Sequence, residues 1–207
     1  MKTIRRSRKN LLFISWFLLG MLCFFISQPL LRFPLLNWLQ GKTEFVAWTI
    51  SYPTMSMVFL ALSAGVFEEV FRYIFKQFLI RPKKSVFLQP ILFGLGHGCM
   101  EVLVLFIPNI SQMITRGTLL MAIIERLIAI IGHIFLTVIV WNGFQREKRA
   151  QYLILAILVH GLLNSMAVIA LSLGLNIWMT EGLLALFDVV GIFYIVHSKK
   201  YYEEGNL

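Results

Sequence analysis

Long apolar segments constrain this chain more than any other feature of its sequence. Apolar runs of about 18 residues or more recur along all 207 residues, separated only by short polar or proline-containing segments. A helix that crosses a bilayer needs about 20 such residues, so each run is long enough for one crossing. Only 14% of the residues are charged, against about 25% in a typical soluble domain. The sequence therefore predicts an all-α, polytopic transmembrane helix bundle.

The apolar runs predict about six spans within a single integral membrane domain, residues 1–207. The spans are expected at about 11–31, 53–80, 85–107, 117–144, 150–171 and 176–196. The first should end near Pro29, followed by an interfacial loop from Arg32 to Tyr52 with a short helix at about 44–50. The basic tetrapeptide at 81–84 should end the second span. Residues 1–52 then form an N-terminal span plus loop, and about 53–197 the main helix bundle.

The basic residues indicate how the spans are oriented. Thirteen of the 19 Lys and Arg residues fall in four segments that six crossings would place on one side: 1–10, 81–84, 145–149 and 197–207. The opposite side would hold only Arg32, Lys42 and Arg116. Cytoplasmic loops carry the excess of Lys and Arg, so both termini are predicted to be cytoplasmic. The net charge of +9 is thus explained by the orientation of a plasma membrane protein, expected to be bacterial, and does not indicate nucleic acid.

Two acids and an arginine interrupt the second apolar run. Each of Glu68, Glu69 and Arg72 would cost about 2.5–3.5 kcal/mol at the centre of a bilayer, which favours a functional reason for their presence. Arg72 follows Glu68 by four residues and Glu69 by three, so either acid can pair with it. Adjacent helical residues point about 100° apart. One carboxylate can therefore hold the ion pair while the other faces a cavity.

Three histidines lie near the middle of three other predicted spans: His97, His133 and His160. Together with the acid pair they place ionisable groups at one depth in four spans, which indicates a shared site. Asn164 follows His160 by one helical turn, and glycines at 94, 96 and 98 would let the backbone around His97 approach a neighbouring span closely. Asp188, in the sixth span, belongs to no motif and is expected to be structural or water-facing.

These motifs, taken in order, resemble a known superfamily. The set Glu68-Glu69-x-x-Arg72, Phe93-x-x-x-His97 and His160-x-x-x-Asn164 resembles the CPBP (Abi-type, CAAX-protease-like) intramembrane proteases. Gly94-x-Gly96-His97-Gly98-x-x-Glu101, followed by Glu125-Arg126 and His133, is most similar to their YhfC-like branch of glutamic-type proteases. The superfamily usually has three residues between the second Glu and the Arg. This chain has two, which leaves open which acid is the base.

The resemblance implies an intramembrane endopeptidase and a role for each matching residue. Glu68 would activate the hydrolytic water, with Glu69 and Arg72 in support. His97 would share the water, and His160 and Asn164 would bind the scissile carbonyl. The remaining residues would play supporting roles: Glu101, Glu125, Arg126 and His133.

The residues leave the need for a cofactor open. Glu68, His97 and His160 could hold Zn²⁺ with an open water position. The HExxH signature of many zinc proteases is absent from the sequence. We therefore favour metal-free base catalysis by glutamate. The expected partners are membrane lipids and a membrane-associated or lipidated peptide or protein substrate.

Two other functions fit the same topology. A non-catalytic immunity or scaffold protein of this fold would tolerate apolar replacements of the polar residues. A small transporter could use the Glu and His cluster as a proton relay, which would need a continuous water path between both faces. Cys23 and Cys99 both lie in apolar segments, which gives no disulfide framework.

Overall fold

Helices dominate the computed structural model, which describes residues 2–80 and 85–203, with side chains from residue 13 onward. Within these residues no strand is present, and one isolated parallel bridge joins Val86 to Glu203. Six helical segments are long and apolar enough to cross a membrane: Phe13–Gln40, Pro53–Leu79, Leu88–Thr115, Leu119–Gln145, Arg149–Ser172 and Ile177–Tyr201. The predicted all-α fold with six spans is confirmed. The tetrapeptide at 81–84, predicted to end the second span, lies outside the described residues.

Several spans are built from more than one helical piece. The chain order is α1 (Lys2–Phe25), η1 (Ile26–Arg32), α2 (Phe33–Gln40), α3 (Thr43–Ser51), α4 (Pro53–Ile74), η2 (Phe75–Leu79), α5 (Leu88–Glu101), η3 (Val102–Phe106), η4 (Ile107–Asn109), α6 (Ile110–Thr115), α7 (Leu119–Gln145), α8 (Arg149–Ser172), α9 (Ile177–Ser198) and η5 (Lys199–Tyr201).

The first span is longer than its sequence suggests. The prediction that it ends near Pro29 is wrong, because the helix continues through the π-helical segment η1 and on to Gln40. Proline lacks an N–H and its ring clashes with the carbonyl four residues earlier. A wider π-turn changes that hydrogen-bond register and accommodates the ring. The predicted interfacial loop therefore shortens, and its predicted short helix is present as α3.

The third span differs from its prediction in the same way. It was expected to end at Pro108, yet helix continues through the 3₁₀ turn η4 into α6 and ends at Thr115. Pro108 occupies an early position of this turn, where a missing N–H leaves no bond unmade. In both spans the proline changes the type of helix without ending it.

Glycines bring α5 very close to its neighbours. A Cβ on Gly96 would lie 2.0 Å from the backbone oxygen of Phe17 in α1, and one on Gly94 would lie 2.6 Å from the Cα of Ile134 in α7. Side chains at these positions would push the helices apart. The close backbone approach predicted for this glycine-rich segment is confirmed, and it holds His97 between α1 and α7.

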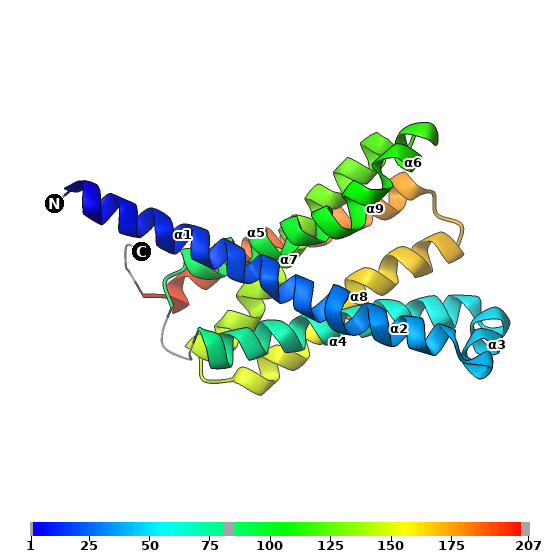
Figure 1. Cartoon of the computed structure of the whole chain (residues 1–207), viewed down its shortest axis with the longest axis horizontal. Helices are drawn as coiled ribbons and strands as arrows, with labels where there is room; N and C mark the ends of the chain where they lie inside the picture. Colours follow the sequence, from blue (N-terminus) through cyan, green and yellow to red (C-terminus); the bar gives the residue numbers. More distant parts are fainter. Residues whose placement is uncertain (1, 81–84, 204–207) are drawn as a thin grey trace.

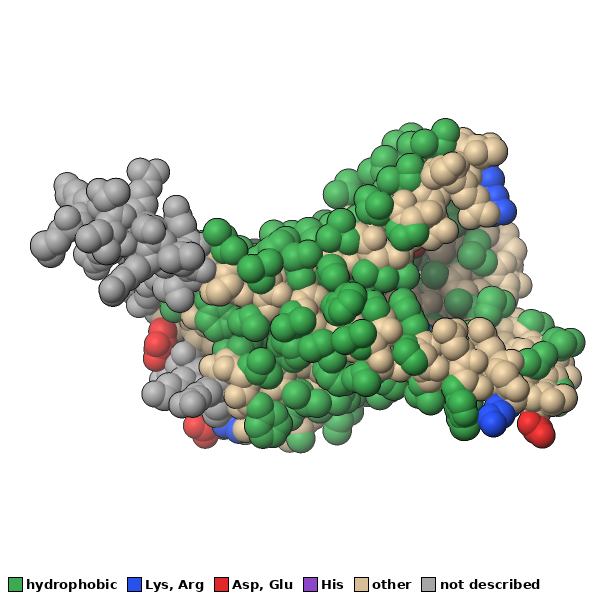
Figure 2. Space-filling model, viewed as in Figure 1, with side chains coloured by type: hydrophobic (Ala, Val, Ile, Leu, Met, Phe, Trp, Pro, Cys, Tyr) green, Lys and Arg blue, Asp and Glu red, His purple; other side chains and the backbone are tan. Residues whose placement is uncertain are grey.

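The bundle is closed at one end and divided at the other. Figure 1 shows α4 and α8 diverging from α7 and α9 towards the loop that joins α8 to α9, while the start of α1 and the end of α9 are at the opposite end. Buried aromatic residues fill the closed end, among them Phe75, Phe93 and Trp141. The space-filling view shows a hollow between the diverging helices (Figure 2). This hollow leads to the polar residues.

Candidate active site

The two neighbouring acids of α4 have different surroundings. Glu69 is completely buried, forms an ion pair with Arg72 and accepts a hydrogen bond from Nδ1 of His160 at 2.7 Å. Glu68 is 4% exposed and lines a cavity. Its Oε2 lies 3.7 Å from Nη2 of Arg72, farther than a hydrogen bond. The spacing left open which acid takes which position, and the structure places Glu69 in the ion pair and Glu68 at the cavity.

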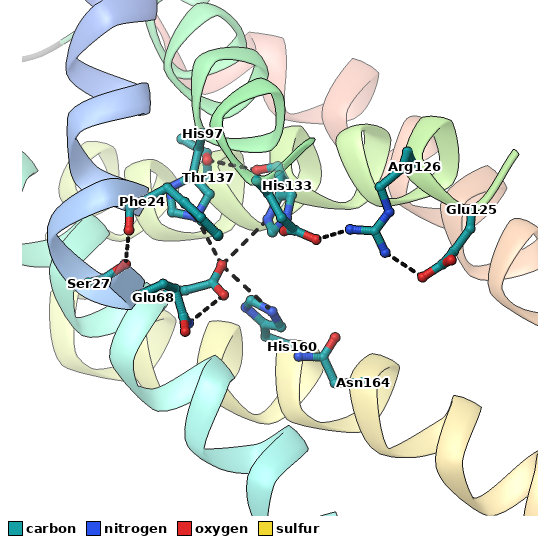
Figure 3. A network of polar contacts seen from close by, with 12 residues as sticks. Phe24, Ser27, Glu68, His97, Glu125, Arg126, His133, Thr137, His160 and Asn164 are labelled. Carbon is teal, nitrogen blue, oxygen red and sulfur yellow. Dashed lines mark hydrogen bonds and ion pairs between the residues drawn. The ribbon is translucent and has the colours of Figure 1, made fainter. Parts of the chain in front are cut away.

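Three imidazoles from three different helices surround one oxygen of Glu68. Its Oε2 lies 2.9 Å from Nε2 of His97, 3.8 Å from Nδ1 of His133 and 4.0 Å from Nε2 of His160. Figure 3 shows these rings, from α5, α7 and α8, converging on the Glu68 carboxylate. The shared depth predicted from the sequence therefore corresponds to one cluster of side chains.

Two of the histidines have a carboxylate behind them. Glu69 accepts from Nδ1 of His160, and Glu101 accepts from Nε2 of His133. An ionised carboxylate only accepts, so these ring nitrogens carry the protons and the opposite nitrogens face Glu68. For His133 a second contact gives the same tautomer. Nη2 of Arg72, which can only donate, lies 2.7 Å from its Nδ1.

Two residues of the first span belong to this network and were missed by the sequence analysis. Gln28 donates from Nε2 to Oε1 of Glu68 at 2.8 Å, and Arg32 donates to Oε1 of Gln28 at 3.0 Å. Arg32 is itself held by Oγ of Ser63 at 3.0 Å and by the carbonyl of Leu60 at 2.6 Å. The available signal was the i,i+4 spacing of two polar residues. This spacing is informative only if the helix continues past Pro29, where the sequence predicts that it ends.

The predicted supporting residues of α7 form a second ion-pair group next to the first. Arg126 pairs with both Glu101 and Glu125, and Glu101 connects it to His133. The chain of contacts runs from Glu125 through Arg126 and Glu101 to the imidazole beside Glu68 (Figure 3). These residues thus lie along one wall of the cavity.

The cavity has a volume of about 420 Å³, within the range of small-molecule binding sites. Its polar lining includes Glu68, His133, His160, Asn164, Glu181 and Asp188. Asn164 lies one turn from His160 on α8, and its only hydrogen bond among the described residues is a long one, 3.5 Å, to the carbonyl of Ala61. His97 does not line the cavity and is fully buried behind Glu68. A water in the cavity therefore reaches Glu68 and His160 before it reaches His97.

The cluster contains a donor set suited to a metal ion. One ligand atom each from Glu68, His97 and His133 lies within 4.8 Å of the other two, and all three residues are buried. The set predicted from the sequence had His160 in place of His133. Imidazole and carboxylate are common zinc ligands, and a carboxylate behind a ligating histidine is typical of such sites. Nδ1 of His133, the ring nitrogen that faces Glu68, accepts a hydrogen bond from Arg72. An ion bound to this nitrogen requires that hydrogen bond to break.

Comparison with known proteins identifies the family. A family model described as "YhfC intramembrane metalloprotease" matches residues 2–116 and 106–184. A protein of Bacillus subtilis (strain 168), described as "Uncharacterized membrane protein YhfC", is 24% identical over 223 residues, which cover 90% of this chain and 85% of the relative. No solved structure matches. The match and the six apolar helices agree on a multi-pass membrane protein, and the chain belongs to the YhfC intramembrane metalloprotease family.

Proposed function

We propose that this protein is an intramembrane endopeptidase that hydrolyses a peptide bond in the cavity between α4, α7 and α8. One observation carries the proposal: Oε2 of Glu68 borders the cavity and has imidazoles from three spans within 4.0 Å. Structural packing would not require so many costly groups around one carboxylate oxygen. Membership of a family described as metalloproteases supports the same activity.

Glu68 is the proposed base. It removes a proton from a water in the cavity as the water oxygen forms a bond to the carbonyl carbon of the substrate. The carbonyl oxygen then carries the negative charge. When the C–N bond breaks, the proton held by Glu68 passes to the leaving nitrogen, which gives a carboxyl and an amine product. Gln28 and His97 hold the Glu68 carboxylate in place through hydrogen bonds of 2.8 and 2.9 Å.

His160 and Asn164 are proposed to bind the carbonyl oxygen. Both line the cavity, one helical turn apart on α8. Nδ1–H of His160 donates to Glu69, and the ring can donate to the carbonyl oxygen from Nε2 when that nitrogen is protonated too. The amide of Asn164 supplies a second donor, since its protein contact is only a 3.5 Å one to Ala61. Two donors directed at the developing oxyanion are the usual means of stabilising it.

The residues present also fit a bound metal ion, for which the family is named. Glu68, His97 and His133 would hold it, with Glu101 fixing the ring of His133. Such an ion would polarise the carbonyl and make the bound water more acidic. We propose the glutamic type within the wider CPBP superfamily, with the metal-dependent type as the alternative that the family description favours. In either case Glu68 supplies the negative charge on which activity depends.

The charge pattern supports a proposal for the side from which the substrate enters. Both termini are proposed to be cytoplasmic, on the count of Lys and Arg in the loops. The hollow in Figure 2 lies at the end away from the termini, which would face the outside of the cell. A membrane-associated or lipidated peptide or protein could reach the cavity from there.

The test is cleavage by the full-length protein in liposomes. Purified protein is reconstituted with a mixture of labelled single-span peptides, and products are identified by mass spectrometry. We expect Glu68→Gln to lower cleavage by at least about 100-fold, the smaller end of the range for a lost general base. Glu69→Gln and His160→Ala should also impair it. Glu44→Gln is the control, because Glu44 is exposed on α3. Full cleavage by all three site variants would refute the proposal.

A further inference from the structure

Two carboxylates on α9 face the cavity but take no part in the proposed chemistry. Glu181 and Asp188 are seven residues apart, so they lie on one face of the helix, about 10 Å from each other along its axis. They are 7% and 6% exposed. Oε2 of Glu181 and Oδ2 of Asp188 are buried without a hydrogen-bond partner among the described residues. Unpartnered buried carboxylates at a cavity indicate a missing partner.

The packing of α9 against α7 places the two acids relative to the site. The helices run in the same direction, and Asn142 of α7 donates to Ser198 of α9 at 2.8 Å. Gly132 and Asp188 are separated by as many residues as Asn142 and Ser198. A Cβ added to Gly132 would lie 3.6 Å from Oδ1 of Asp188. Gly132 directly precedes His133. Asp188 therefore lies beside the catalytic cluster, and Glu181 lies two turns farther towards the open end.

The cations that line this cavity already have partners. Arg126 is paired with Glu101 and Glu125. Arg32 is held by Gln28, Ser63 and the carbonyl of Leu60. Within the described lining no third Lys or Arg is present to pair with α9. When ionised, the α9 acids give the cavity an excess of negative charge, which favours a positively charged ligand.

The spacing of the acids argues against a metal ion as that ligand. Metal–oxygen distances are about 2.0–2.6 Å, so two carboxylates about 10 Å apart cannot share one ion. In the described chain the group with ligand atoms close enough for an ion is the Glu68, His97 and His133 cluster. An elongated organic cation fits better, because each acid can contact a different part of an extended chain.

We propose that Asp188 and Glu181 form a subsite for lysine or arginine side chains of the peptide substrate. This inference rests on the proposed function, since it takes a peptide to be the occupant of the cavity. Asp188 lies next to Gly132, the residue before His133, and therefore binds the basic residue nearest the scissile bond. Glu181 binds basic residues nearer the open end. The subsite selects substrates with basic residues on one side of the cleaved bond.

A binding measurement tests the subsite without requiring cleavage. The full-length Glu68→Gln protein in detergent is titrated with two labelled twelve-residue Leu/Ala peptides that differ only in carrying one lysine or one norleucine. We expect the lysine peptide to bind about tenfold more tightly. Asp188→Asn and Glu181→Gln should each reduce that preference, and the double variant should abolish it. Glu44→Gln, an exposed acid on α3, should leave it unchanged.

A second measurement covers the case in which a variant does not fold. A carbodiimide activates carboxylates and joins them to a nearby amine as an amide. With the lysine peptide bound to the Glu68→Gln protein, we expect amide crosslinks at Asp188 or Glu181. Crosslinks only at exposed acids, equal binding of the two peptides, or no binding of either would overturn the subsite. Because neither experiment uses cleavage, such a result would leave the proposed hydrolysis to its own test.

Discussion

The two ends of the bundle differ in what fills the space between the helices. At the closed end, Phe93 and Trp141 are fully buried and their ring centroids lie 4.9 Å apart. At the divided end a cavity of about 420 Å³ is lined by carboxylates, arginines and histidines. Packing of apolar side chains holds the first region together. The second places polar groups where they add little to stability.

This difference suggests how a small membrane protein can keep a polar cavity among its spans. The helices that carry the cavity are fixed at the closed end by aromatic contacts and, near the middle, by glycines that let α5 approach α1 and α7. The divided end then needs no contact of its own across the cavity. Stability and function should therefore respond to substitutions in different halves of the molecule.

The largest expected effect is a loss of stability on truncating the closed end. Trp141→Ala removes a fully buried side chain that contacts Phe93, and such changes cost about 3–5 kcal/mol. The midpoint of unfolding of the detergent-solubilised protein should fall accordingly. Asp188→Asn at the divided end is the comparison and should shift stability by less than about 1 kcal/mol. Equal losses for the two variants would show that the ends do not differ as we infer.

A smaller effect is expected on metal affinity at the divided end. An ion held by Glu68, His97 and His133 would be found by elemental analysis as about one divalent ion per chain. Glu101→Gln weakens the carboxylate behind His133 and should lower the affinity by about 10–100-fold. Glu125→Gln is the control, since Glu125 contacts Arg126 and no histidine. A wild-type protein that binds no ion and stays active with chelators would instead favour metal-free catalysis by glutamate.

The sequence predicted what depends on patterns along one helix. Apolar run lengths were enough for six spans, and the spacing of the two acids and Arg72 was enough to predict an ion pair, though not which acid forms it. It did less well where neighbouring helices decide the outcome. His97 was expected to share the hydrolytic water, but close packing of α5 against α1 places it behind Glu68, outside the cavity lining.

Two further differences have the same physical origin. Pro29 is compatible with an ended helix or with a π-turn, and only the packed structure distinguishes them. For that reason Gln28 and Arg32 were not recognised as part of the site. Asp188 could be placed at the cavity only once α9 was known to run alongside α7, with Gly132 opposite the acid.

The smallest expected effect concerns Gln28, which holds Glu68 in position and is not proposed to touch the reacting atoms. Gln28→Leu removes one hydrogen bond to the Glu68 carboxylate, which is worth about 1.5–3 kcal/mol when intact, and part of this should be recovered through His97. We expect kcat to fall by about 3- to 10-fold with KM unchanged, together with a shift of the acidic limb of the pH–rate profile. Gln40→Leu, exposed at the end of α2, is the matched control. A rise in KM alone, or an unshifted pH profile, would mean that Gln28 only packs the first span against α4. In that case activity would be less sensitive to changes in the polar lining of the divided end than the comparison with the closed end implies.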